Sequence, residues 1–334
     1  MPASLSPRVL VVLTVAFIAA VFVFAGVYTA TQHNPTPHQM RVGVVGPLDV
    51  QLKLKAGLAL SAPGYFKLYT YADKAALESA IKDRKVYGGY VQKPGAGLLI
   101  TASAAGKAPQ TALTLVAAKL AAAVPEPLET QDLVPLPSGD SQGLSSYTFQ
   151  YGLLVPAFVF GVLIFMFAGG LSCVWRLGLI AGYSIGSGIL GALTVDQIVG
   201  ALPGHFVALA ALAALYSAMA ALVTYGLAKL MGYAGLALSG LLLILVGNST
   251  GGGSINQEFL PNTFRDFGQV LPNGAFIRTV RDTVYFHGHN TGQSLMVVAL
   301  WALGGLVLIL VAGPVRSLVA RPMRAKKAAV KPAS

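Results

Sequence analysis

Two arginines three residues apart, Arg278 and Arg281, are the side chains of this sequence best placed to do chemistry. They follow a Pro-started segment in which Phe264, Phe267 and Leu271 share one apolar face. A guanidinium binds anionic oxygens well, and an amphipathic helix beside it is typical of a membrane interface. We therefore predict two Pro-started helices. Their arginines either reach out to lipid phosphates, which we favour, or line a substrate path.

The other polar motifs do not match known catalytic patterns. His287 and His289 flank one glycine, but carboxylate ligands are scarce nearby, so we expect no metal site. Residues 248–254 are rich in glycine like a phosphate-binding loop, yet they lack a lysine and follow an apolar segment, so we expect a flexible link. Gly106-Lys107 lacks the Walker spacing, and any ATPase must be another polypeptide. The sequence therefore predicts no enzyme, no cofactor and no metal.

The composition explains why so few polar side chains are present. Apolar residues make up 55% of the 334 positions and charged residues only 10%, whereas a soluble domain carries about 25% charge. Long uncharged runs alternate with one charged block, residues 32–146. The formal charge of +11 does not lie on a polar face interleaved with aromatic residues, so we expect no nucleic-acid partner. Cys173 is the single cysteine, which excludes an internal disulfide.

Six apolar segments are predicted to cross a membrane, and membrane lipids are therefore the first expected partners. The predicted spans are residues 9–30, 151–172, 177–195, 205–228, 232–247 and 295–312, the fifth being shorter and hinged at Lys229. None of them carries a charged residue or a histidine in its interior, which disfavours an ion-coupled transporter. Residues 28–30 make a poor cleavage site, so we favour an uncleaved anchor over a signal peptide.

The basic residues near the ends of these spans predict the orientation. Arg8, Arg176, Lys229 and the basic tail, residues 316–334, fall on one side of the predicted topology. Both termini are then cytoplasmic in a multi-pass protein of the cell (plasma) membrane. The segments predicted to lie outside are residues 31–147, 196–204 and 248–294.

The block between the first two spans is predicted to be an extracytoplasmic α/β domain. Its expected strands are residues 41–46, 66–71, 86–92 and 98–102, with one helix between the first two strands and others at 75–85, capped by Asp73, and 111–123. Residues 125–144 are read as a Pro-rich return to the membrane. The chain then divides into an anchor, the α/β domain, a five-helix domain and a basic tail: residues 1–30, 31–147, 148–315 and 316–334.

Gly178, Gly182 and Gly186 recur every fourth residue and share one face of the third predicted span. Small residues at this spacing let two helix backbones approach closely. The partner helix belongs either to the same chain, which we favour, or to a second copy.

With this layout the chain resembles the membrane subunits of type-2 ABC exporters, nearest the YhgE/Pip phage-infection proteins and the fungal nitrosoguanidine-resistance membrane proteins. The likeness covers nearly the whole chain. Its motifs are Val86-Tyr87-Gly88-Gly89-Tyr90 after a helix, then Leu260-Pro261, Leu271-Pro272 and Arg278 to Arg281 before the last helix. The resemblance implies a dimer of permease-like subunits that exports lipids, drugs or envelope precursors, driven by a separate ATPase. The short inner segments, residues 1–8 and 172–176, leave a second class open: a non-transporting envelope scaffold or binding protein.

Overall fold

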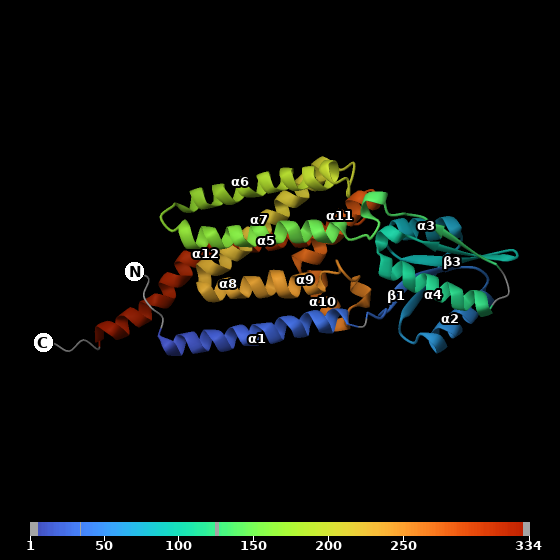
Figure 1. The fold of residues 1–334 in the computed structure, drawn as a ribbon, viewed down its shortest axis with the longest axis horizontal. Coiled ribbons are helices and arrows are strands. Elements are labelled where there is room, and N and C mark those ends of the chain that lie inside the picture. The colour runs from blue at the N-terminus through green and yellow to red at the C-terminus, as the bar shows by residue number, and fades with distance from the viewer. Residues whose placement is uncertain (1–5, 34, 124–126, 330–334) are drawn as a thin grey trace.

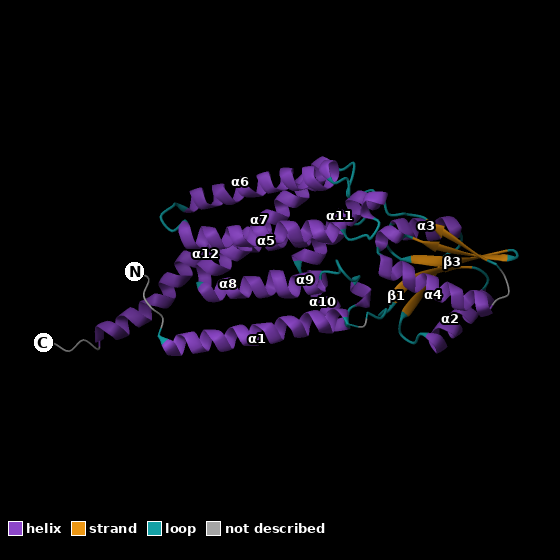
Figure 2. Ribbon diagram, viewed as in Figure 1, coloured by secondary structure: helices purple, strands orange, loops and turns teal. Residues whose placement is uncertain are grey.

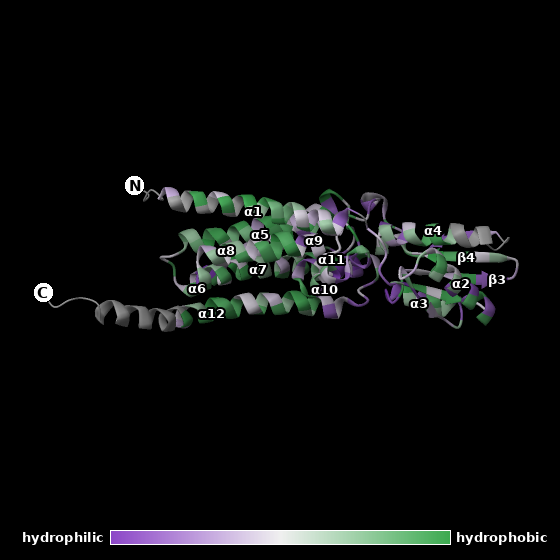
Figure 3. Ribbon diagram, turned by 90° about the horizontal axis from the view of Figure 1, so that it is seen from below, coloured by the Kyte–Doolittle hydropathy of each residue, from purple (hydrophilic) through white to green (hydrophobic). Residues whose placement is uncertain are grey.

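The computed structural model describes residues 6–33, 35–123 and 127–329. The molecule is elongated and mostly helical, with a helical bundle at one end and a small α/β domain at the other (Figure 1). All strands within the described residues lie in the α/β domain (Figure 2). Hydrophobic residues dominate the bundle, and hydrophilic residues gather at the junction between the two parts (Figure 3). The change from uncharged runs to a charged block along the sequence therefore coincides with a change of architecture.

The α/β domain is built on one five-stranded sheet with the order β2-β1-β3-β4-β5. β1 runs parallel to β2 and β3, β4 is antiparallel to β3, and β5 is parallel to β4. The strands are β1 (Met40–Val45), β2 (Phe66–Thr70), β3 (Gly88–Lys93), β4 (Ala96–Thr101) and β5 (Leu128–Asp132). Four of them confirm the predicted strands. β5 falls inside the segment read as a plain return to the membrane, so that interpretation is wrong.

Helices cover both faces of the sheet. They are α2 (Leu48–Ser61), α3 (Lys74–Lys82) and α4 (Lys107–Ala123). Leu77 of α3 lies very close to the sheet. A Cβ added to Gly43 would lie 2.2 Å from the Leu77 Cδ1 atom, and a Cβ added to Gly89 would lie 2.9 Å from it. On the opposite face, α4 places Leu113 against Gly88. The glycines in β1 and β3 therefore allow α3 and α4 to pack directly on the strands.

The N-terminus of α3 confirms the predicted cap, because the Asp73 carboxylate accepts a 2.8 Å hydrogen bond from the Ala76 amide. We expect Asp73→Ala to lower the stability of the α/β domain by about 1 kcal/mol, the usual contribution of such a cap. Thermal unfolding together with hydrogen exchange of the α3 amides measures this. Asp49→Ala removes an exposed first-turn carboxylate of α2 that makes no cap and serves as the control. Equal effects of the two substitutions would contradict the prediction.

Within the described residues, five helical segments are long and apolar enough to cross a membrane. They are α5 (Ser145–Phe167), α6 (Cys173–Ala192) with the π-helical turn Leu193–Ile198, α7 (Phe206–Met231), the run α8 (Tyr233–Gly240), Leu241–Val246 and α9 (Gly247–Thr250), and the first part of α12 (Thr291–Ala329). α7 is the central helix and carries many of the fully buried side chains. The chain thus has the helices of a membrane protein.

α1 (Pro7–Gln32) lies along the outside of this bundle (Figure 1). Those apolar side chains of α1 that the structure describes are largely exposed, Phe22 to 81%, as are many of those of α6, where Val174 is 80% exposed. Such surfaces suit contact with lipid or with another protein copy. That residues 9–30 form a sixth span stays a prediction, as does the orientation.

Two details of the bundle correct the predicted spans. The break between α7 and α8 is at Gly232, whose φ of +68° is a conformation that favours glycine, and not at Lys229. Lys229 instead lies inside α7 and donates from Nζ to the Ile309 carbonyl at 2.7 Å. α12 also continues as a helix to Ala329, so the described part of the predicted tail is helical. Residues 330–334 of that tail lie outside the described residues.

The glycine face of α6 does not pack as we favoured. A Cβ added to Gly178, Gly182 or Gly186 would meet no atom within 4 Å in the described part of the chain, so packing of these residues within the chain is wrong. The glycine that contacts α7 is Gly188, where an added Cβ would lie 2.4 Å from the Ala210 carbonyl oxygen. The three predicted glycines lie on an open face of the helix.

Candidate functional site, a basic pocket between the domain and the bundle

The α/β domain and the bundle are joined by two short helices, α10 (Asn262–Val270) and α11 (Pro272–Tyr285). Pro261 precedes the first and Pro272 begins the second, which confirms the two Pro-started helices. Apolar side chains on either side of them belong to both cores. Phe259 and Phe286 pack into the core of the α/β domain, whereas Phe276 packs into that of the bundle. The linking segment is therefore part of both hydrophobic cores.

Residues 247–253 are part of this joint and are buried, so the prediction of a flexible link is wrong. A Cβ on Gly253 would lie 2.2 Å from the ring of Tyr147, and one on Gly268 of α10 would lie 2.0 Å from the Thr250 carbonyl oxygen. Asn248 donates from Nδ2 to the hydroxyls of Tyr28 and Tyr147, at 3.0 and 3.2 Å. The glycines of this buried segment therefore serve close packing.

Polar contacts hold the α/β domain against the joint. Arg84, just after α3, makes an ion pair through Nη1 with the Asp282 carboxylate of α11, at 2.5 Å. Asn256 donates to the Ala105 carbonyl at 2.9 Å, and His289 Nδ1 lies 2.8 Å from an Asp83 oxygen. The Asp83 carboxyl has a lowered pKa, chiefly because of its hydrogen bond with His289. These contacts fix the domain on the bundle at several separate points.

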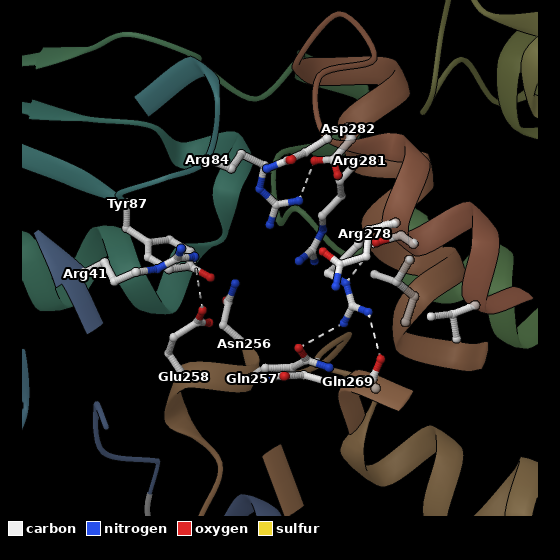
Figure 4. Close-up of a pocket in the computed structure, with 17 residues that line it drawn as sticks. Arg41, Arg84, Tyr87, Asn256, Gln257, Glu258, Gln269, Arg278, Arg281 and Asp282 are labelled. Carbon is white, nitrogen blue, oxygen red and sulfur yellow. Dashed lines mark hydrogen bonds and ion pairs between the residues drawn. The ribbon is translucent and has the colours of Figure 1, made fainter. Parts of the chain in front are cut away.

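Between these contacts lies a pocket of about 280 Å³ whose lining is unusually rich in charge (Figure 4). Its charged and amide side chains include Arg41, Arg84, Arg278, Arg281, Glu258, Asp282, Asn256 and Gln257. Arg41 and Arg84 come from the α/β domain, while Arg278 and Arg281 come from α11. With four guanidinium groups and two carboxylates, the lining has a formal charge of +2.

The positive charge is concentrated on the α11 side of the pocket. Arg278 donates to Gln257 Oε1 at 2.9 Å, to Ser294 Oγ at 3.2 Å and to the Gln269 carbonyl at 3.4 Å. Arg281, only 5% exposed, donates to Ser146 Oγ at 3.1 Å and to the carbonyls of Gly143 and Gly253. All these acceptors are neutral.

Burial and the positive charge of Arg84 lower the pKa of Arg278 and of Arg281. A guanidinium nevertheless keeps its proton at neutral pH, because arginine is the most basic of the protein side chains. Two poorly compensated cations are therefore held in a partly buried site.

Nearby carboxylates are already engaged. Asp282 is paired with Arg84, and burial raises the pKa of its carboxyl against the opposing effect of that arginine. Glu258 lies 4.0 Å from Arg41 and beside Tyr87, whose pKa is raised by burial and by the Glu258 charge. Asp140 attracts Arg281 from outside the lining, but its oxygens accept hydrogen bonds from Leu144, Ser145 and Tyr285. The lining thus keeps a net positive formal charge after its two carboxylates are counted.

The structure separates the four residues predicted as interfacial or in a substrate path. Arg278 and Arg281 line the pocket together, whereas Phe264 and Phe267 of α10 do not belong to its lining. Phe267 is 55% exposed and faces away from the core, as an interfacial residue would. The favoured interpretation, arginines extended toward lipid phosphates, is wrong for Arg281, which is buried inside the protein.

The sequence did not predict that Arg41 and Arg84 belong to the same site. Arg84 has a φ of +54°, in the left-handed position after a helix that glycine usually occupies. That conformation is visible only in the structure, because the sequence pattern places Arg84 inside the helix predicted at 75–85. Arg41 sits in a strand, and only the fold brings either arginine to the pocket.

Comparison of the chain with protein-family models, with curated proteins and with solved structures finds no match. Function is therefore inferred from the pocket and the helices that carry it.

Proposed function

We propose that this protein is a permease-like subunit of an export system for lipids, drugs or envelope precursors, with α1 as a sixth span and the α/β domain outside the membrane. The supporting observation is the basic pocket between the domain and the bundle. Burying a cation without an ion pair is costly, and a site for an anion would account for Arg278 and Arg281, whose hydrogen-bond acceptors are all neutral. A compound leaving the membrane would meet this pocket first.

The apolar interior of the helices is consistent with such a role and not with ion coupling. The basic side chains in the described parts of α5 to α7 lie near the ends of their helices, as with Arg176 at the start of α6 and Lys229 near the end of α7. A transporter without ionisable groups at mid-membrane needs another source of energy. We therefore include a separate ATPase in the proposal.

A non-transporting envelope scaffold is the second candidate, and the short connections at the other end of the bundle favour it. α5 and α6 are joined by residues 168–172, and α7 and α8 by Gly232 alone. These loops give an ATPase little surface. Removing the α/β domain would not separate the two candidates, because Phe259 and Phe286 of the joint would lose the core in which they are buried.

Reconstitution tests the proposal. The full chain in liposomes, with the candidate ATPase that co-purifies with it, is expected to move a fluorescently labelled phospholipid between leaflets in an ATP-dependent manner. The quenching of the label by an impermeant reductant measures the movement. Empty liposomes and an ATPase variant without its Walker lysine are the controls. If no ATPase associates with the chain and no ATP-dependent movement of the lipid is measured, the scaffold is the better account.

A dimer belongs to the same proposal. The exposed glycines Gly178 and Gly182 let a helix of a second copy approach α6, and the apolar side chains around them are exposed. The mass of the protein in detergent, measured by light scattering, tests this directly.

A further inference from the structure

We propose that the basic pocket is a binding site for a phosphoryl group, held chiefly by Arg278 and completed by Arg41 and Arg281. The inference deepens the proposed function. Only the idea that the bound ligand is transported depends on the proposed export function. Binding itself follows from the pocket and can be measured without transport.

The charge of the pocket favours a phosphoryl group over a carboxylate. The lining has a formal charge of +2, and neither α11 arginine makes an ion pair within the described residues. A phosphate monoester carries about 1.5 to 2 negative charges at neutral pH and presents three acceptor oxygens. A carboxylate would neutralise about half of the charge and accept from fewer donors.

The geometry of the donors also fits an anion with several oxygens. Arg278 and Arg281 approach from α11, while Arg41 approaches from β1 on the opposite wall (Figure 4). The planar fork of a guanidinium gives two parallel hydrogen bonds to a phosphate. Arg41 is 41% exposed, so this side of the pocket reaches the surface. A ligand can enter beside Arg41 and reach Arg278.

The position of the pocket suits either a lipid headgroup or a water-soluble phosphate compound. Ser294, in the first turns of α12, lines it, so the pocket lies where the long apolar helix begins. Lipid phosphates lie at this level of a bilayer. The exposed Phe267 and Val270 of α10 add apolar surface near Gln269, which lines the pocket.

Binding measurements on the full chain in a neutral detergent test the site. Glycerol 1-phosphate is the soluble probe, with glycerol as its uncharged control. Phosphatidic acid in nanodiscs of phosphatidylcholine is the lipid probe, with pure phosphatidylcholine as the control. Thermal shift and calorimetry report binding to the wild type and variants. Affinity is expected to fall as salt is raised, because the contact is ionic.

Arg278→Gln is expected to weaken binding about tenfold or more, since a hydrogen bond to a charged group contributes enough for that factor. Arg41→Gln, at the exposed wall of the pocket, is expected to weaken binding by a smaller factor. This variant replaces Arg278→Gln in the test if Arg278→Gln does not fold. Lys53→Gln removes an equal charge from an exposed position of α2, outside the pocket, and should leave affinity unchanged.

Each outcome decides between sources or overturns the site. Binding of glycerol 1-phosphate that Arg278→Gln weakens, with no higher affinity for phosphatidic acid, assigns a soluble phosphate compound. Tighter binding of phosphatidic acid than of glycerol 1-phosphate, or binding of phosphatidic acid alone, with the same loss, assigns a lipid headgroup. The proposal is overturned by no binding of either probe, or by equal binding in the wild type, Arg278→Gln and Arg41→Gln. Binding without export would overturn only the transport role.

Discussion

Asp282→Ala is expected to destabilise the docking of the α/β domain by about 3–5 kcal/mol, as when one partner of a buried ion pair is removed. The side chains of Arg84 and Asp282 are only 13% and 4% exposed. Without the carboxylate, Arg84 would remain as a third poorly compensated cation near Arg278 and Arg281. Hydrogen exchange should rise in α3 and α11 first, and the melting temperature in detergent should fall.

The neighbouring carboxylate provides a matched control. Asp83 contacts His289 and Lys85, but these partners are mostly exposed, and surface pairs of this kind contribute about 0–1 kcal/mol. Asp83→Ala should therefore change exchange much less than Asp282→Ala. Equal effects would show that the Arg84–Asp282 pair does not hold the domain.

A double variant distinguishes the effect of the unpaired buried charge on stability from the effect of lost packing at the joint. Arg84→Met combined with Asp282→Leu removes both charges and keeps comparable apolar volume, and it is expected to recover much of the lost stability. Recovery should be incomplete, because the Asp282 charge also favours the charged forms of Arg278 and Arg281. A double variant as unstable as Asp282→Ala would mean that packing, and not the unpaired charge, caused the loss.

The sequence predicted those parts of the fold that depend on local pattern. Runs of apolar residues predicted the helices of the bundle, and Asp73 predicted the start of α3. Each of these patterns lies within a single helix or at its end. β5 was missed because Leu128–Asp132 has one apolar residue and pairs along only one edge, with β4. Its strand conformation is fixed by the neighbouring strand and not by its own composition.

The pocket was predicted only in part, because its residues come from distant segments. Arg278 and Arg281 could be singled out by their spacing, but whether they faced lipid or protein depended on what packed over α11. The structure places Arg84 and Asp282, 198 positions apart, in direct contact. No pattern within either segment predicts that contact, so the inward direction of the arginines could not be derived.

The contacts of the bundle glycines also could not be predicted from the sequence pattern alone. They lead to the second prediction with a large expected effect. A four-residue spacing identified Gly178, Gly182 and Gly186 as a packing face, yet the closest glycine contact between α7 and α12 is made elsewhere. A Cβ on Gly226 would lie 2.7 Å from the Gly305 carbonyl oxygen, and one on Gly305 would lie 2.7 Å from the Val223 amide nitrogen.

Gly226→Val and Gly305→Val are each expected to separate α7 from α12 and to destabilise the bundle. Overpacking usually costs about 1–3 kcal/mol, and the loss should be at the upper end here because the obstructing atoms are backbone. Less folded protein after extraction into detergent and a lower melting temperature would report the effect.

Gly182→Val is the matched control, since a Cβ added there meets nothing within 4 Å in the described part of the chain. It should leave the melting temperature of a monomer nearly unchanged. If α6 contacts a second copy, the same substitution should reduce the dimer mass measured by light scattering without unfolding the chain. A fall in stability equal to that of Gly226→Val, with no change in mass, would contradict both the open face of α6 and its use between copies. Because Gly182 is exposed and Gly226 is enclosed, this one comparison distinguishes packing within the chain from packing between chains.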